Sequence, residues 1–195
     1  MSEKIETEAK IKITSEEYNS LSVDLSNKIS KVLRESLLRD YTDVFKELSQ
    51  TNIFYKNAEN ILLRMRIEQR TGMCGYQKPN IYLTHKTNPN ENSVYKSVNE
   101  DEIEVAEGDL ENLLKSIGFE EQVRYQKKRT NFIYNECAVS LDILPNDKRY
   151  IEIEGEEKNI SEVIQRLGLQ NKPIEKRSYL EILRGTKDGG RKKRS

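Results

Sequence analysis

Apolar and charged residues alternate along several short stretches of the chain, and the first stretch shows this most clearly. Near the N-terminus, Glu6, Glu8 and Lys10 are separated by single uncharged residues, and Ile5, Ala9 and Ile11 occupy alternate positions. Successive side chains of a β-strand point to opposite faces of the sheet. The spacing therefore predicts a strand with one charged face and one largely apolar face.

Similar alternation recurs along much of the chain. It predicts about eight strands, near residues 3–13, 51–57, 61–69, 80–87, 95–106, 123–134, 137–144 and 148–156. An eight-stranded barrel is about the smallest that can enclose a small ligand. The predicted fold class is therefore α+β: a closed, antiparallel, eight-stranded β-barrel with a charged, hydrated interior and helices packed against its apolar outer face.

Helical signals lie between and after these strands. Thr14-Ser15-Glu16-Glu17 is typical of a helix start, with a capping residue followed by acids. Helical spacing then continues over 15–48, as one helix or several pieces. The apolar stripe of this region consists of Ile29, Val32, Leu33, Leu37, Tyr41, Val44, Phe45 and Leu48.

Three further helices are predicted from their ends. Asp109 and Ser161 are candidate N-caps of two helices that end at Gly118 and Gly168, because glycine suits the left-handed position after a helix. Ser178 is the candidate N-cap of a last helix.

Composition sets bounds on the organisation of the chain. Its 195 residues favour one domain, taken as 1–184, followed by a basic tail over 185–195 that we expect to be disordered. Met73 to Pro79 is typical of a hairpin loop. Acidic and basic residues balance at 33 each, so net charge gives no argument for a nucleic-acid or membrane partner.

The compartment follows from cysteine usage and from the start of the chain. Cys74 and Cys137 are too few for a disulfide framework, which favours a reducing, cytoplasmic compartment. No signal peptide is visible, and no stretch approaches the ~20 apolar residues of a membrane span.

The charges are sorted between the predicted strands. Carboxylates gather on the strands near 3–13, 95–106, 137–144 and 148–156, whereas bases gather on those near 61–69, 80–87 and 123–134. For any one strand, a solvated outer face with cross-strand ion pairs explains the pattern. Sorting across strands instead favours a cavity for a metal-bound polyphosphate, because carboxylates bind hard divalent cations and bases bind phosphate oxygens.

No other catalytic pattern competes with this interpretation. The chain has one histidine, His85, on the opposite parity from Lys86, so we expect it to pack on the outer face. No Ser/His/Asp or Cys/His constellation and no glycine-rich phosphate loop is present.

The charged positions fall into a series of short motifs. In chain order over 3–183 they are Glu6-x-Glu8-x-Lys10, Leu63-Arg64-x-Arg66, Leu83-Thr84-x-Lys86, Glu102-x-Glu104, Lys127-x-Arg129, Leu141-Asp142, Glu152-Ile153-Glu154 and Lys176-x-Ser178-Tyr179. In this order they resemble the CYTH superfamily, the triphosphate tunnel metalloenzymes. That group includes thiamine and inorganic triphosphatases, class IV adenylyl cyclases and, more distantly, RNA triphosphatases.

The resemblance implies a role for each matched residue. Phosphates would be held by Lys10, Arg64, Arg66, Lys86, Lys127 and Arg129. Mg²⁺ or Mn²⁺ would be held, or water positioned, by Glu6, Glu8, Glu102, Glu104, Asp142, Glu152 and Glu154. Catalysis would involve Glu8, Lys10, Glu154 and Lys176, with the two lysines neutralising charge at the reacting phosphate.

Some positions depart from the family pattern. Many members carry an arginine just before the central Glu-x-Glu pair, where this chain has Glu100 and Asp101; Lys96 is a candidate substitute. Lys56 stands where an aspartate often follows the second strand. The region 15–48 is longer than in compact members.

Three functions remain open at this stage. The first is a metal-dependent hydrolase of inorganic triphosphate, thiamine triphosphate or a nucleoside triphosphate. The second is a class IV-type adenylyl cyclase that converts ATP to cyclic AMP, and the third is a non-catalytic polyphosphate or nucleotide-binding module. In each, the partner is a triphosphate-containing small molecule, with neither a membrane nor a specific nucleic acid expected, and the protein is a monomer or homodimer.

Overall fold

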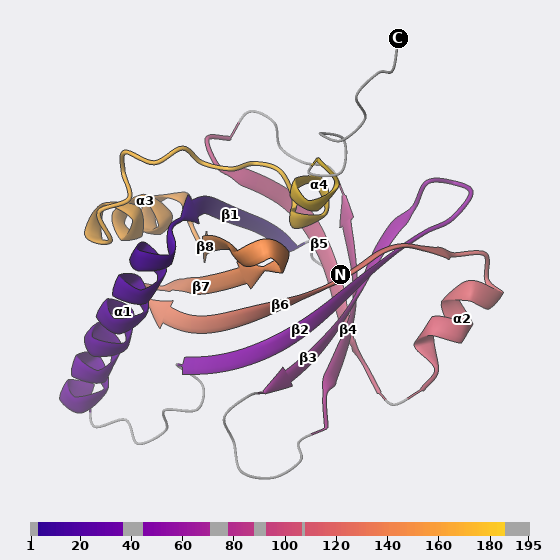
Figure 1. Cartoon of the computed structure of the whole chain (residues 1–195), viewed down its shortest axis with the longest axis horizontal. Helices are drawn as coiled ribbons and strands as arrows, with labels where there is room; N and C mark the ends of the chain where they lie inside the picture. The colour runs from indigo at the N-terminus through magenta and orange to yellow at the C-terminus, as the bar shows by residue number, and fades with distance from the viewer. Residues whose placement is uncertain (1–3, 37–44, 71–77, 88–92, 107, 186–195) are drawn as a thin grey trace.

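Eight strands form a closed antiparallel barrel in the computed structural model, which describes residues 4–36, 45–70, 78–87, 93–106 and 108–185. The strands are β1 (Lys4–Ile13), β2 (Phe45–Lys56), β3 (Leu62–Arg70), β4 (Asn80–Thr87), β5 (Lys96–Val105), β6 (Glu120–Tyr134), β7 (Cys137–Leu144) and β8 (Lys148–Glu154). Around the barrel their order is β1-β5-β4-β3-β2-β6-β7-β8 (Figure 1). The predicted fold class is confirmed.

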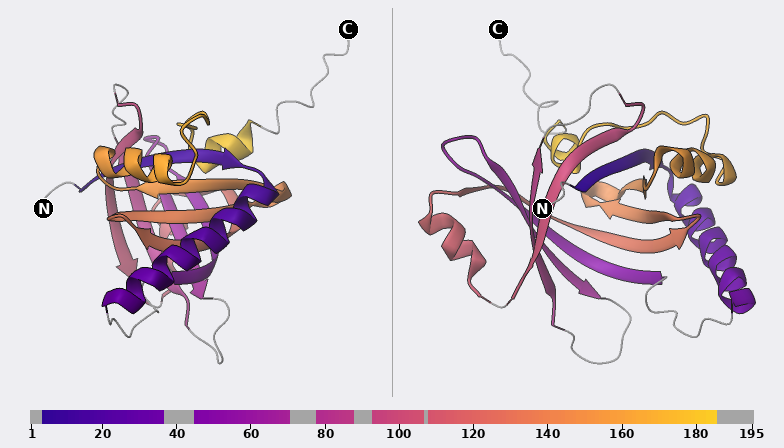
Figure 2. Two further views of the ribbon diagram at one scale, coloured as in Figure 1. Left: turned by 90° about the vertical axis from the view of Figure 1, so that its left-hand side faces the viewer. Right: turned by 180° about the vertical axis from the view of Figure 1, so that it is seen from behind.

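The helices lie outside the strands. They are α1 (Ser15–Ser36), α2 (Leu110–Ser116), α3 (Glu157–Arg166) and α4 (Tyr179–Arg184), with a short 3₁₀ turn at Pro145–Asp147. Figure 2 shows α1 and α3 against one side of the barrel and α2 on the other. None of the helices in the described ranges is long and apolar enough to cross a membrane.

The helical region 15–48 is shorter than predicted. The helix α1 ends at Ser36, and Phe45 and Leu48 belong to β2, which pairs with β6 from Phe45 onward. Apolar spacing over so few residues fits a helix or a strand, and backbone pairing with β6, and with β3 from Leu48 onward, decides for a strand. The predictions for 37–44, 71–77, including Cys74, and 186–195 fall outside the described residues.

Capping confirms three of the predicted helix starts. At α1, the Glu17 amide donates to Thr14 Oγ1 and the Thr14 amide donates to the Glu17 carboxylate, which closes a capping box. The Asp109 side chain caps α2, and Ser178 caps α4. Each cap satisfies amides that the first helical turn leaves unpaired.

The start of α3 was predicted wrongly. The helix begins at Glu157 rather than after Ser161, whose hydroxyl donates to the Glu157 carbonyl oxygen and bonds the Tyr95 hydroxyl. A serine within a helix can satisfy its hydroxyl by donating to a carbonyl oxygen one turn earlier. The presence of Ser161 therefore did not mark the first residue of the helix. Gly168 has a φ of 72°, as predicted for the residue after the helix.

Two apolar clusters lie between the barrel wall and the helices. Under α1 and α3, Ile11 and Ile151 are fully buried together with Leu25 and Ile160. Full burial of one such side chain contributes roughly 1.5–3 kcal/mol.

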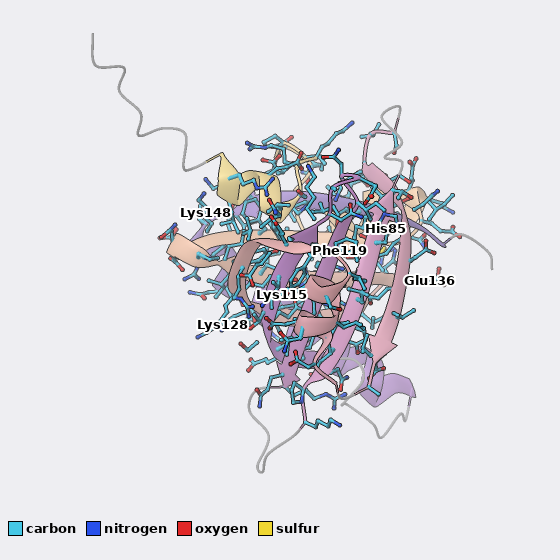
Figure 3. All side chains as sticks on the ribbon, turned by 90° about the vertical axis from the view of Figure 1, so that its right-hand side faces the viewer. His85, Lys115, Phe119, Lys128, Glu136 and Lys148 are labelled. Atoms are coloured by element: carbon cyan, nitrogen blue, oxygen red, sulfur yellow. The ribbon has the colours of Figure 1, made fainter. Side chains whose placement is uncertain are left out.

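A second cluster forms under α2. It joins Leu114 to Ile53 and Met65. Phe119, which is labelled in Figure 3, follows the helix and belongs to the same cluster. Because these clusters use the outer strand faces, the alternate side chains are left to fill the barrel interior.

Candidate functional site

A cavity of about 1060 Å³ runs through the barrel interior. All of the predicted site residues except Asp142 and Lys176 line it: Glu6, Glu8, Lys10, Arg64, Arg66, Lys86, Glu102, Glu104, Lys127, Arg129, Glu152 and Glu154. The strand alternation therefore places the charged faces inward, as the sequence predicted. His85 is absent from this lining, and its neighbours Thr84 and Lys86 are part of it.

Strand register brings the acidic and basic motifs together. The β1–β8 pairing sets Glu8 opposite Glu154 and Lys10 opposite Glu152. Residues directly opposite in an antiparallel pair lie close enough for their side chains to interact. The outer residues at the alternate positions, such as Ile11 and Ile151, fix this register because a slip by one residue would expose them.

Three carboxylates converge where β1 meets β8. Oxygen atoms of Glu6, Glu8 and Glu154 lie within 4.8 Å of one another. Burial, together with the neighbouring Glu6 and Glu152, raises the pKa of Glu154 to about 7. Burial and Glu152 also oppose ionisation of Glu8, but Lys10 and Lys96 outweigh them and lower its pKa.

This donor set fits a divalent cation. Oxygen ligands from a few carboxylates are what Mg²⁺ and Mn²⁺ prefer. Repulsion between the Glu6, Glu8 and Glu154 carboxylates is a cost that a bound cation would relieve. Three of the seven predicted metal-binding residues are thus brought together here.

The bases of β3 and β4 face carboxylates of β5. Arg66 Nη2 lies 2.8 Å from Glu102 Oε1, and Arg64 Nη2 lies 3.4 Å from Glu102 Oε2. Thr84 donates its hydroxyl to the same Glu102 carboxylate at 2.6 Å. The pKa of Glu102 is lowered because Arg66, Thr84 and Arg64 outweigh the effect of burial. Glu102 thus forms ion pairs with both arginines and positions them on the cavity wall.

Lys10 is almost fully buried between two acids. Its Nζ lies 3.0 Å from Glu8 Oε1 and 3.2 Å from Glu152 Oε1. Nζ also donates to the Arg177 carbonyl oxygen at 3.1 Å and lies 4.7 Å from the centre of the Tyr179 ring. Burial opposes the charge of Lys10, but Glu152 and Glu8 raise its pKa above the ordinary value.

A second buried network lies on β6 and β7. Lys127 Nζ lies 3.0 Å from Asp142 Oδ2, and Arg129 donates to both oxygens of Asp142 and to Glu152. Burial lowers the pKa of Lys127 to about 8, and the nearby Arg129 contributes. Burial alone would raise the pKa of Glu152, yet Lys10, Arg129 and Lys127 hold it well below its usual range.

Two predicted site residues do not line the cavity. Asp142 is fully buried, and its carboxylate is bound to Lys127, Arg129 and the Tyr179 hydroxyl, so it anchors these two bases and does not face the cavity. Lys176 is exposed and donates to the Ser93 carbonyl oxygen at 2.8 Å. The loop before α4 directs it away from the interior.

Several lining residues were not among the predicted site residues. Lys96, noted only as a substitute, binds Glu8 at 2.9 Å. Glu68 lies on the same inward face of β3 as Arg66, and Glu100 lies on the same inward face of β5 as Glu102. The alternation of charged residues along these strands could therefore have identified both. Phe54 and Tyr125 lie stacked in the wall with ring centroids 6.2 Å apart. Pairing across β2 and β6 creates this aromatic surface, and no spacing within either strand signals it.

Comparisons with known proteins show the fold. No family model matches the chain, and no curated protein sequence matches it. Among solved structures, PH1819 protein from Pyrococcus horikoshii OT3 is 24% identical, with a TM-score of 0.67 and coverage of 93% of this chain and 99% of that one. At this identity the match is one of fold.

Two further structures of the same fold carry functional names. A putative adenylate cyclase from Vibrio parahaemolyticus is 15% identical, with a TM-score of 0.58 and coverage of 94% and 99% of the two chains. The Mimivirus capping enzyme triphosphatase is 10% identical, with a TM-score of 0.52 and coverage of 85% and 88%. These structures show that the chain has the barrel fold that the resemblance implied.

Proposed function

We propose that this chain, which has the triphosphate tunnel fold, is a metal-dependent triphosphate hydrolase. The observation that carries the proposal is the placement of the Glu6, Glu8 and Glu154 carboxylates in the same cavity as the bases of β3, β4 and β6. A triphosphate needs several positive charges along its length and a divalent cation for its remaining charge. The bases and the carboxylates that could hold such a cation line one cavity of about 1060 Å³.

The bases would bind and orient the phosphate chain. Arg64 and Arg66 present guanidinium groups that suit phosphate oxygens, while Lys86 and Lys127 supply ammonium groups. Because phosphoryl transfer requires mainly positioning and charge neutralisation, such a set can supply much of the rate enhancement. Lys10, fixed between Glu8 and Glu152, would neutralise charge at the reacting phosphate.

The carboxylate cluster would hold Mg²⁺ or Mn²⁺. A cation bound by Glu6, Glu8 and Glu154 would polarise a phosphoryl oxygen and lower the pKa of a bound water. In hydrolysis, an oxygen of water forms a bond to the terminal phosphorus and the anhydride P–O bond breaks. Glu154, at this cluster, would be placed to orient the water and to accept the proton that it loses.

Phosphate release tests this proposal. The purified chain should hydrolyse at least one of inorganic triphosphate, thiamine triphosphate and ATP with Mg²⁺ or Mn²⁺, and EDTA should abolish the reaction. Release of orthophosphate identifies a hydrolase. Absence of turnover on all three substrates with both metals, combined with tight binding of one of them, would instead identify a non-catalytic binding module.

Adenylyl cyclase activity is the second candidate. The stacked Phe54 and Tyr125 line the same cavity as the arginine and lysine side chains. Their rings offer an apolar surface on which the adenine of ATP could stack. A putative adenylate cyclase also shares the fold. In that reaction the ribose hydroxyl attacks the α-phosphorus and diphosphate leaves. Detection of cyclic AMP and diphosphate, rather than ADP and orthophosphate, would identify this activity.

A further inference from the structure

Glu100 lies within the cavity and contacts two of the phosphate-binding bases at once. Its Oε1 lies 3.2 Å from Arg64 Nη2, and its Oε2 lies 3.1 Å from Lys86 Nζ. The side chain is 11% exposed, so these pairs are largely shielded from bulk water. Each carboxylate oxygen takes one base, an arrangement that two oxygens of a phosphate group would also satisfy.

The surroundings of Glu100 differ from those of its neighbour on the same strand face. Glu102 is fixed by the Thr84 hydroxyl at 2.6 Å and by Arg66 at 2.8 Å. The contacts described for Glu100 are to the charged groups of Arg64 and Lys86, with no hydroxyl donor among them. Glu100 therefore contributes negative charge to both bases at once, in addition to Glu102 at Arg64 and Glu6, 2.8 Å from Lys86 Nζ.

The position of Glu100 makes it a competitor of phosphate. An anion that binds Arg64 and Lys86 must either replace Glu100 at these bases or bind beside its negative charge. Repulsion between like charges is strong in a partly shielded site, and it grows with the charge of the ligand. Because inorganic triphosphate carries one more ionisable oxygen than a triphosphate ester, the carboxylate should weaken its binding more.

We propose that Glu100 is a specificity-determining residue that competes with substrate phosphate for Arg64 and Lys86 and thereby favours triphosphate esters over inorganic triphosphate. The inference rests on the proposed function, since it assumes that these bases bind the substrate. It assigns to Glu100 a role distinct from metal binding and from catalysis.

Glu100→Gln removes the charge and keeps the shape of the side chain. Binding of inorganic triphosphate and of ATP is measured by calorimetry in EDTA, so that neither turnover nor metal binding contributes. We expect the variant to bind inorganic triphosphate at least about tenfold more tightly than the wild type, with a smaller gain for ATP. Glu162→Gln, the same change on the outer surface of α3 beside Arg166, should leave both affinities unchanged.

Glu100→Ser provides a second test, because a short polar side chain in a hydrated cavity removes the charge by a different route. Thermal unfolding of each variant checks that the barrel remains folded. If the folded variants bind inorganic triphosphate no more tightly than the wild type, or if neither they nor the wild type binds it detectably, the inference is overturned. Equal gains for inorganic triphosphate and ATP would overturn the proposed specificity. Hydrolysis by the wild type with Mg²⁺ would still support the proposed function in either case.

Discussion

The Tyr179 hydroxyl donates a hydrogen bond to Asp142 Oδ2 at 2.7 Å and so joins α4 to the buried interior of the barrel. Asp142 also binds Lys127 and Arg129, which connects α4 to two bases of the cavity wall. Burial and the charge of Asp142 raise the pKa of Tyr179 well above its ordinary value, so the hydroxyl stays a donor. The position of α4 and the orientation of these bases are therefore coupled.

Replacing Tyr179 by phenylalanine tests this coupling. The change removes a buried hydrogen bond to a charged group and should lower the free energy of unfolding by about 1.5–3 kcal/mol, as measured by urea denaturation. Tyr18→Phe is the matched control, because the Tyr18 hydroxyl lies 3.5 Å from Thr130 Oγ1 and contributes little. Equal losses of unfolding free energy in the two variants would show that the hydrogen bond from Tyr179 to Asp142 stabilises the protein no more than the Tyr18 contact does.

The carboxylate cluster is tested by Glu6→Gln combined with Glu8→Gln. These changes remove two of the three converging carboxylates while keeping their size. We expect affinity for Mn²⁺, measured by calorimetry, to fall by more than about a hundredfold, with loss of metal-dependent phosphate release. Circular dichroism should show an unchanged fold. Turnover equal to that of the wild type would rule out these residues as the metal site.

Arg64→Ala tests the assignment of the basic wall. Loss of one guanidinium should raise KM for a triphosphate by about ten- to a hundredfold, since charge-assisted hydrogen bonds to phosphate would be lost. Arg124→Ala is the matched control, because Arg124 pairs with Glu111 and Glu121 outside the cavity. If KM and kcat of Arg64→Ala match those of the control, Arg64 does not contact the substrate.

The pKa of Lys127 predicts a pH dependence of substrate capture. With a pKa of about 8, the ammonium group is charged below pH 8 and loses its proton above it. We therefore expect kcat/KM to fall above pH 8 by up to about tenfold per pH unit, because the neutral amine attracts phosphate poorly. Lys127→Arg should move this fall to higher pH, since a guanidinium stays charged. A profile that is flat through pH 9.5 in the wild type would contradict the assignment.

Much of the fold and of the site follows from local sequence patterns. The alternation around Glu6, Arg64 and Glu152 predicted both the strands and their charged faces, because a strand has a side-chain period of two. Caps such as Asp109 and Ser178 were equally readable, since their hydrogen bonds reach only three residues along the chain. These features depend on neighbours in sequence and need no knowledge of the tertiary structure.

Other features depend on contacts between distant segments. Phe45 and Leu48 belong to β2 because β6 supplies backbone partners. Asp142 is an anchor because Tyr179, from α4, reaches its carboxylate, and Lys176 lies outside the cavity because its loop turns toward Ser93.

By itself, the sequence determined that a charged face runs along most strands and that carboxylates and bases are sorted between these faces. The tertiary structure decided which charges meet. The pairing of β1 with β8 brings the carboxylates of Glu6, Glu8 and Glu154 together. The pairing of β3, β4 and β5 places Glu100 next to Arg64 and Lys86. The physical reason is that strand alternation is a local property of the backbone, whereas ion pairs across a barrel are set by pairing order and register between segments far apart in sequence.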